Sequence, residues 1–410
     1  MRSIRVQGRF GVIAVALALA LLPVARADFE TGMSHLKSGK YLEAASEFQA
    51  LVDENPEYAD GYHLLGVCFL QSRKYADAEK NFLEAISLNG DKFEYHFNLA
   101  KTYQAMEKYS KQVGTLNNAE GLATTNKQKQ LLYHARGFAL AAQKKWGESV
   151  DDLERSLALQ PDPVTQTQLG KAYYMLGDHA AAVTALRKAV KASPSADTYE
   201  LLIEGMIDLA AKASGEAANS KYREARAEAE RFLEFDSSSF AARYLLGRAA
   251  LGAGEFDKAI AAFQEVLRQQ PDQCRAMTNM GTAYQAKSDW ANALSSLENA
   301  TRCDPSLNLA WQTKGFVVQK TASETKDLNE QIKKYEEAIA AYKKALALKP
   351  SGSIEEKIRI CQENIKVARE NLGMEAEEIA NAQAIQAEKD RIAEEERKRL
   401  EWEEKQAEDD

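Results

Sequence analysis

Proline, glycine and cysteine are scarce in this chain, which has 8 prolines, 22 glycines and 4 cysteines among 410 residues. Such low proline and glycine contents exclude a collagen-like chain and a low-complexity, mostly disordered one. Only 5 histidines are present and the formal net charge is −8, which is not the profile of a general nucleic-acid binder. Hydrophobic residues make up 45% and charged residues 28%, a balance typical of a folded protein.

Long hydrophobic runs are also lacking, apart from one at the N-terminus between Phe10 and Leu22. It follows three arginines and precedes an Ala-Arg-Ala motif that ends at Ala27. At 1.5 Å per residue it reaches only about 20 Å, too short for a bilayer core of about 30 Å. Residues 1–27 therefore resemble a secretory signal peptide, with a retained anchor as the alternative. We predict an exported chain without a membrane span, in the periplasm or else secreted.

One sequence pattern recurs about every 34 residues, with a ring-bearing residue before an alanine-rich segment. A glycine lies nine residues before six of these positions, and a proline lies fifteen residues after six of them. Proline there ends a helix, and glycine permits close helix packing. The pattern predicts a series of helical hairpins. The recurring positions are Tyr41, Tyr75, Tyr109, Trp146, His179, Tyr222, Phe256, Trp290 and Tyr335.

This pattern resembles the tetratricopeptide repeat family. The resemblance implies an all-α, right-handed superhelical solenoid of about nine helix-turn-helix repeats over residues 28–352, and another helical-hairpin solenoid is the alternative. Repeats three and six are degenerate. Insertions near 211–220 and 321–331 are expected to lengthen the turns of repeats six and nine, or else to extend the first helix and add a looser turn. They are either tolerated surface insertions or partner-specific protrusions. The eighth repeat shows the match most fully, in Met277, Met280, Gly281, Tyr284, Ala293, Leu297, Ala300 and Pro305.

The C-terminal segment continues with a single helical stripe of apolar residues. It predicts a capping helix over residues 353–373 that covers the last repeat. Residues 374–410 are good helix formers rich in charge, so we predict a long charged helical tail. That tail is either a solvated helix or a weak coiled coil with a partner or a second copy. The stripe consists of Ile354, Ile358, Cys361, Ile365, Ala368 and Leu372.

Residues with the spacing of a catalytic or metal site are missing. No histidine pair has metal-ligand spacing, and no phosphate-binding or nucleophile-elbow motif occurs. We therefore predict neither an enzyme nor a bound cofactor or metal. Cys274 and Cys303 lie at the two ends of the eighth hairpin, so an oxidising compartment would permit a disulfide between them. Two free thiols are the alternative.

The resemblance implies that the first helices line a concave groove. No repeat has the lysine with which chaperone-binding members of the family clamp a C-terminal carboxylate, so that activity is not implied. We predict a non-catalytic scaffold that binds an extended or helical protein segment or peptide there, unless the rings only pack against neighbouring helices. The alternative is an envelope-assembly component that self-associates through residues 374–410. The candidate groove residues are His63, Phe97, Lys101, His134, Phe138, Lys171, Tyr174, Tyr244 and Arg248.

Overall fold

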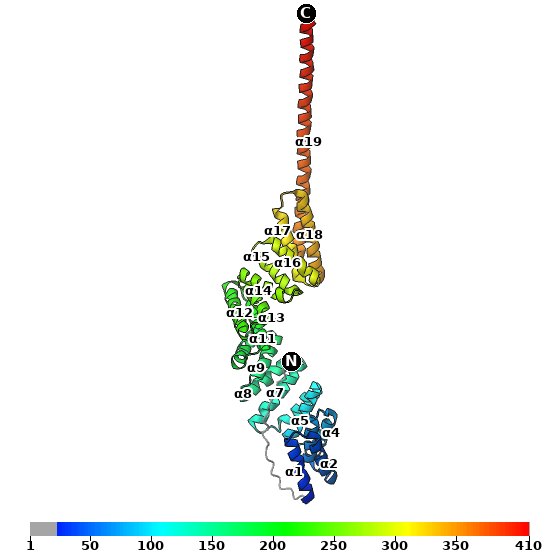
Figure 1. The fold of residues 1–410 in the computed structure, drawn as a ribbon, viewed down its shortest axis with the longest axis vertical. Helices are drawn as coiled ribbons and strands as arrows, with labels where there is room; N and C mark the ends of the chain where they lie inside the picture. Colours follow the sequence, from blue (N-terminus) through cyan, green and yellow to red (C-terminus); the bar gives the residue numbers. More distant parts are fainter. Residues whose placement is uncertain (1–22, 410) are drawn as a thin grey trace. The chain divides into compact units, whose positions relative to one another are not determined.

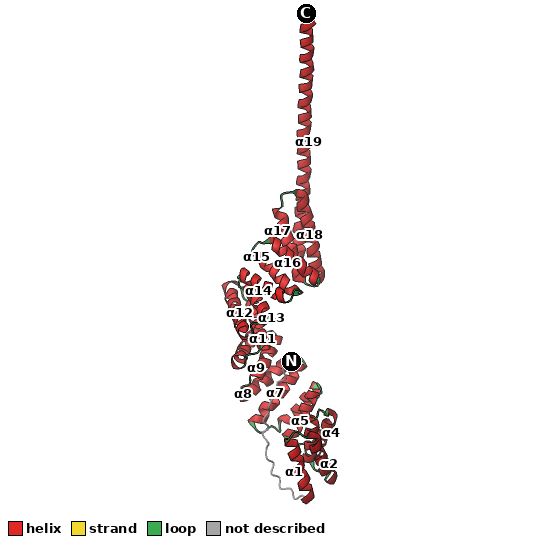
Figure 2. Ribbon diagram, in the orientation of Figure 1, coloured by secondary structure: helices red, strands yellow, loops and turns green. Residues whose placement is uncertain are grey.

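The structure, a computed structural model, describes residues 23–409. Every secondary-structure element in that range is an α-helix (Figure 2). The prediction of an all-α fold built from helical hairpins is confirmed. Residues 1–22 of the predicted signal peptide lie outside the described residues, and Asp28, the first residue after the predicted signal peptide, falls within the first helix.

The chain divides into two compact units between Ser193 and Pro194. Unit 1 contains α1 (Pro23–Lys37), α2 (Tyr41–Glu54), α3 (Ala59–Gln71), α4 (Tyr75–Leu88), α5 (Phe93–Ala105), α6 (Tyr109–Glu120), α7 (Asn126–Ala142), α8 (Trp146–Leu159), α9 (Pro163–Leu176) and α10 (His179–Ala192). Unit 2 contains α11 (Ala196–Ala211), α12 (Gly215–Phe235), α13 (Phe240–Gly252), α14 (Phe256–Gln269), α15 (Cys274–Ala286), α16 (Trp290–Cys303), α17 (Asn308–Glu324), α18 (Leu328–Leu348) and α19 (Gly352–Asp409).

Seven of the nine hairpins are held by close contact between a glycine of the first helix and a large side chain of the second helix. A Cβ atom added to Gly66 would lie 2.6 Å from the Phe82 ring, and one added to Gly247 would lie 2.6 Å from Phe263. Both rings are fully buried. Because no Cβ fits there, the glycine determines how closely the two helices approach.

Repeat six reverses this arrangement. Ile203 takes the place of the glycine, and Ala229 stands where other repeats have the large side chain. Both residues are fully buried in α11 and α12, which pack against each other. A large side chain on the first helix and a small one on the second thus fill the same space, as volume-conserving exchanges do in other cores.

The two insertions lengthen helices rather than turns. Helix α11 ends at Ala211 and α12 already begins at Gly215, so only three residues separate them. Likewise α17 ends at Glu324 and α18 begins at Leu328. The expectation of longer turns is therefore wrong, because the alanine, glutamate and lysine of these segments are strong helix formers.

Helix α19 is one continuous helix of 58 residues. In its first part Ile354, Cys361 and Ile365 are buried in the core that also contains Tyr342 of α18. Its later part extends beyond α17 and α18 in Figure 1, and its described side chains between 376 and 398 are exposed. Gly373 does not interrupt the helix.

Candidate functional site

The first helices of successive repeats contact one another within each unit. Helix α3 contacts α5, α5 contacts α7 and α7 contacts α9, whereas the second helices of successive repeats in the described chain make weaker contacts or none. The same holds for α11, α13, α15 and α17 in unit 2. Each row of hairpins is therefore tighter on the side of its first helices. We call the surface formed by α3, α5, α7 and α9 the first-helix face of unit 1, and that formed by α11, α13, α15 and α17 the first-helix face of unit 2.

His63 connects repeats two and three on the first-helix face of unit 1. Its ring stacks on Tyr95 with 4.8 Å between centroids, and its Nε2 lies 2.9 Å from Nδ2 of Asn98. Burial lowers the pKa of His63 to about 4. The imidazole is thus neutral near pH 7, and its role in the structure is packing between helices.

Asp60 forms a polar contact beside His63 that the sequence analysis missed. Its carboxylate accepts hydrogen bonds from Lys92 Nζ at 2.7 Å and from the Tyr95 hydroxyl. Burial acts to raise the pKa of Asp60, but these two hydrogen bonds outweigh it and hold that pKa below its usual value. The partners are 32 and 35 residues away, so a search at the repeat spacing of about 34 would have found this pair.

Lys101 lies on α5, one turn after Phe97. Phe97 stacks on Phe93 at 5.3 Å between centroids, which places this ring largely in packing. Lys101 is half-buried, and burial lowers its pKa. It forms no ion pair in the described part of the chain. The structure thus leaves a partly desolvated cation on this face without a carboxylate.

The next two first helices carry the remaining unit 1 candidates. His134 stacks on Phe138 at 4.5 Å, and its Nδ1 lies 2.7 Å from Oγ1 of Thr165. Burial lowers the pKa of His134. Lys171 on α9 is exposed, and Tyr174 meets the ring of His179 edge-on at 5.2 Å.

Repeat position 9, directly after the glycine position, aligns three of these side chains. It is occupied by Lys101, Phe138 and Lys171 in repeats three, four and five. Since successive first helices pack at about 8–10 Å, the two lysines are on the order of 20 Å apart with a ring between them.

Tyr244 and Arg248 belong to unit 2, so the structure does not join them to the unit 1 candidates. The Tyr244 hydroxyl accepts a hydrogen bond from Nδ2 of Asn279 at 3.3 Å, and Arg248 lies 4.0 Å from Glu204. Beside that pair, burial raises the pKa of Glu200, and Asp197 and Glu204 add to the effect. The first-helix face of unit 2 is therefore acidic near α11, and its arginine has an acidic neighbour.

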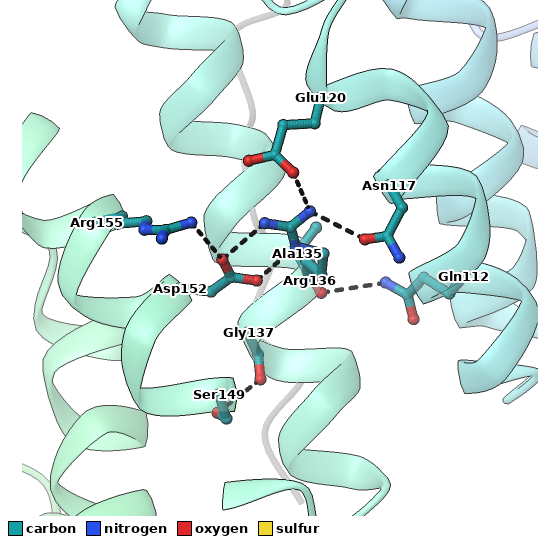
Figure 3. Close-up of polar contacts among 9 residues, drawn as sticks. All are labelled: Gln112, Asn117, Glu120, Ala135, Arg136, Gly137, Ser149, Asp152 and Arg155. Atoms are coloured by element: carbon teal, nitrogen blue, oxygen red, sulfur yellow. Dashed lines mark hydrogen bonds and ion pairs between the residues drawn. The ribbon is translucent and has the colours of Figure 1, made fainter. Parts of the chain in front are cut away.

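An ion network connects repeats three and four (Figure 3). Arg136 of α7 is 7% exposed, and its Nε and Nη2 donate to the carboxylate of Asp152 at 2.6 and 2.9 Å. Its Nη1 donates to Glu120 at 2.6 Å and to Asn117 at 3.0 Å. The hydrogen bonds that Arg136 donates to Asp152, and then to Glu120, raise the pKa of Arg136, and the bond that Glu120 accepts lowers the pKa of Glu120. Sequence reasoning missed this network, although an arginine where five other repeats have leucine was a signal.

A disulfide joins Cys274 and Cys303, whose Cα atoms are 5.6 Å apart. It ties the beginning of α15 to the end of α16, the adjacent ends of the eighth hairpin. The other two cysteines are buried thiols, and burial raises the pKa of Cys68 to about 12 and that of Cys361 to about 11.

The residues that the structure describes contain no group of three side chains that could hold a metal ion. Within the same residues, no helix combines the length and apolar character needed to cross a membrane.

A pocket of about 740 Å³ lies between α8, α9 and α10, lined in part by Leu157, Pro161 and Lys188. None of the candidate groove residues lines it.

Models of the tetratricopeptide repeat match residues 29–93, 134–197 and 211–273, and a second model of the same repeat matches residues 327–351. Together these segments cover about half of the chain. The repeat pattern read from the sequence thus agrees with independent models of the repeat.

Several curated proteins resemble the chain at low identity. DnaJ protein P58IPK homolog A of Oryza sativa subsp. japonica is 22% identical over 297 residues, which are 68% of this chain and 62% of that protein. DnaJ homolog subfamily C member 7 homolog of Schizosaccharomyces pombe is 23% identical over 350 residues, covering 70% and 72%. Superkiller complex protein 3 of Mus musculus is 30% identical over 82 residues, covering 20% of this chain. The chain spans 5% of the mouse protein and less than two thirds of the rice protein.

Solved structures of repeat proteins also resemble the chain. A tetratricopeptide repeat protein from Parabacteroides merdae has a TM-score of 0.48 and 15% identity, over 66% of this chain and 98% of that one. The C-terminal part of a repeat protein from Cytophaga hutchinsonii has a TM-score of 0.49 and 18% identity, over 62% and 99%.

Proposed function

Because the chain belongs to the tetratricopeptide repeat family, we propose that it is a non-catalytic scaffold that acts outside the cytoplasm. In this proposal it binds an extended or helical segment of a partner protein on the first-helix face of unit 1. The family's fold serves protein binding, which supports the first part. The signal-peptide pattern of residues 1–27 and the Cys274–Cys303 disulfide support export to an oxidising compartment.

The observation that carries the proposal is the lack of an acidic partner for Lys101. An ammonium group loses solvation when it is half-buried, and a nearby carboxylate would offset that cost. The described residues provide no such carboxylate, so the group is free to pair with one from another molecule. Lys171, also at position 9, is exposed to solvent.

The line formed by Lys101, Phe138 and Lys171 defines the kind of segment that would fit. It should carry an apolar side chain for the central ring and an acidic or carbonyl group towards each lysine. A span of about 20 Å corresponds to roughly six residues of extended chain or thirteen of helix. We assign His63 and His134 to packing, because each is already engaged with the next first helix.

The experiment is in-cell crosslinking of the tagged chain, followed by identification and quantification of the crosslinked protein. We expect the variant K101E/K171E to lose most of the crosslinked partner, because two attractive contacts become repulsive. A matched control is K188E, which reverses an exposed lysine on the second helix α10. Equal yields from the two variants would exclude the first-helix face of unit 1 as the binding surface.

A further inference from the structure

A second apolar stripe follows the exposed side of α19. It consists of five large aliphatic side chains that are 41–59% exposed, namely Ile360, Val367, Met374, Ile385 and Ile392. Their spacings are 7, 7, 11 and 7 residues. Two turns of helix take about 7.2 residues and three take about 10.8, so all five project from one side of the helix. The stripe covers roughly 48 Å along the helix axis.

This stripe is separate from the one that caps the last repeat. The capping stripe, with Ile354, Cys361 and Ile365, is buried against α18. At 100° per residue, the two stripes point roughly 140° apart around the helix axis. The exposed stripe therefore begins beside the repeats but faces away from them, and it continues into the projecting part of α19.

We propose that this stripe pairs α19 with α19 of a second copy of the chain, in an antiparallel two-stranded coiled coil. A seven-residue spacing keeps one side of a helix turned towards a partner helix. The single eleven-residue step corresponds to an insertion of four residues, which unwinds the supercoil locally without moving the stripe to another side.

Charged residues on the same side of α19 indicate which helix pairs with the stripe and in which direction that helix runs. Glu378 and Lys389 both lie in line with the stripe and are exposed. Parallel helices in register would place each Glu378 against the other Glu378, and each Lys389 against the other Lys389. Antiparallel helices centred between residues 383 and 384 instead place Glu378 of each copy opposite Lys389 of the other. The same register places Ile385 opposite the small side chain of Ala382.

The interface contains one large aliphatic residue for every two or three turns, and polar residues lie between them. Such a coiled coil is weaker than one with apolar residues at both core positions of each heptad. Dimerisation should therefore depend on concentration.

The test is sedimentation equilibrium of the purified full chain over a wide concentration range. We expect reversible dimerisation of the natural chain and a dissociation constant at least tenfold higher for the variant I385E/I392E. The matched control is I379E. Ile379 is also aliphatic and 58% exposed, but it lies in line with the capping stripe. Because all three side chains are exposed, circular dichroism should show unchanged helix content.

Two results would overturn the proposal: a natural chain that stays monomeric at every concentration, or dimerisation weakened equally by I379E and I385E/I392E.

The direction of the paired helices is tested by mixing chains that carry E378C with chains that carry K389C and oxidising them. We expect the mixed disulfide to dominate, whereas disulfides between identical variants would show parallel helices and reject the antiparallel arrangement. The native thiols Cys68 and Cys361 are buried and should not interfere. Dimerisation should be unchanged in K101E/K171E, so this proposal and the partner-binding proposal can fail independently.

Discussion

The first-helix faces of the two units are built on the same packing but differ in charge. Gly66 of unit 1 and Gly247 of unit 2 each meet a buried phenylalanine at the same distance. Directly after the glycine position, unit 1 has Lys101, which lacks an ion pair among the described residues, whereas unit 2 has Arg248 beside Glu204. The comparison shows that packing constrains the glycine position, whereas the residue at position 9 differs between the units in its charged neighbours.

Substitutions in the packing that the two units share should give the largest losses of stability. These losses should be equal in both units. We expect F82A in unit 1 and F263A in unit 2 each to lower the free energy of unfolding by about 3–5 kcal/mol, because each leaves a cavity against a glycine. Chemical denaturation gives the size, and hydrogen exchange identifies the unit that is affected. L83A removes an exposed neighbour of Phe82 and should cost less than about 0.5 kcal/mol. A loss below 1 kcal/mol in only one unit would mean that the two units are not packed alike.

Breaking an ion pair should lower stability more in unit 1 than in unit 2, because the pair chosen in unit 1 is buried and the one in unit 2 is partly exposed. R136M leaves Asp152, which is 3% exposed, with only the more distant Arg155 at 3.9 Å, so we expect a loss of about 3–5 kcal/mol. R248M breaks a partly exposed pair with 4.0 Å between its charged atoms, which should cost less than about 1 kcal/mol. Chemical denaturation of both variants measures the difference. The double variant R136M/D152L should regain most of the loss, and no recovery would show that Asp152 is not the source of the cost.

Acid should act with opposite signs at two residues, His63 of unit 1 and Glu200 of unit 2. All five histidines of the chain precede residue 194. The pKa of His63 is about 4 in the folded chain, so the unfolded chain binds more protons at any pH between that value and about 6.5. Unit 1 should lose up to about 3 kcal/mol as the pH falls through this window. In unit 2 the raised pKa of Glu200 means that the folded state takes up the proton first, so acid stabilises the fold at this residue.

Hydrogen exchange as a function of pH can follow each unit separately. We expect H63Q to remove much of the acid sensitivity of unit 1, because the amide keeps a polar group beside Asn98 but does not titrate. Asp60, Glu94 and Lys92 also face this site, and the two carboxylates oppose the effect of burial on the imidazole. An unchanged pH profile in H63Q would show that another group causes the sensitivity.

The repeat fold could be predicted because its determinants recur locally in the sequence. Glycine, ring and proline positions repeat in phase, and the helix ends follow them. The packing of individual rings could not be predicted in this way. Whether His63 binds a ligand or packs depends on Tyr95 and Asn98 of the next repeat, and on how much water that contact removes. The Arg136 network was missed for a similar reason, since its partners come from two further helices.

Substitutions of Lys101 and Lys171 should give the smallest changes in stability. They test most directly the difference in charge between the two first-helix faces. K101M removes a half-buried cation that no described carboxylate offsets, so unit 1 should become slightly more stable, by up to about 0.5 kcal/mol. K171M removes an exposed cation and should leave stability unchanged. Denaturation curves and crosslinking yields of the two variants separate these effects. Both should reduce crosslinking of the partner, because each removes one attractive contact. If K101M instead destabilised unit 1, the ammonium group of Lys101 would already have a partner within the chain. Lys101 would then no longer distinguish the first-helix face of unit 1 from that of unit 2.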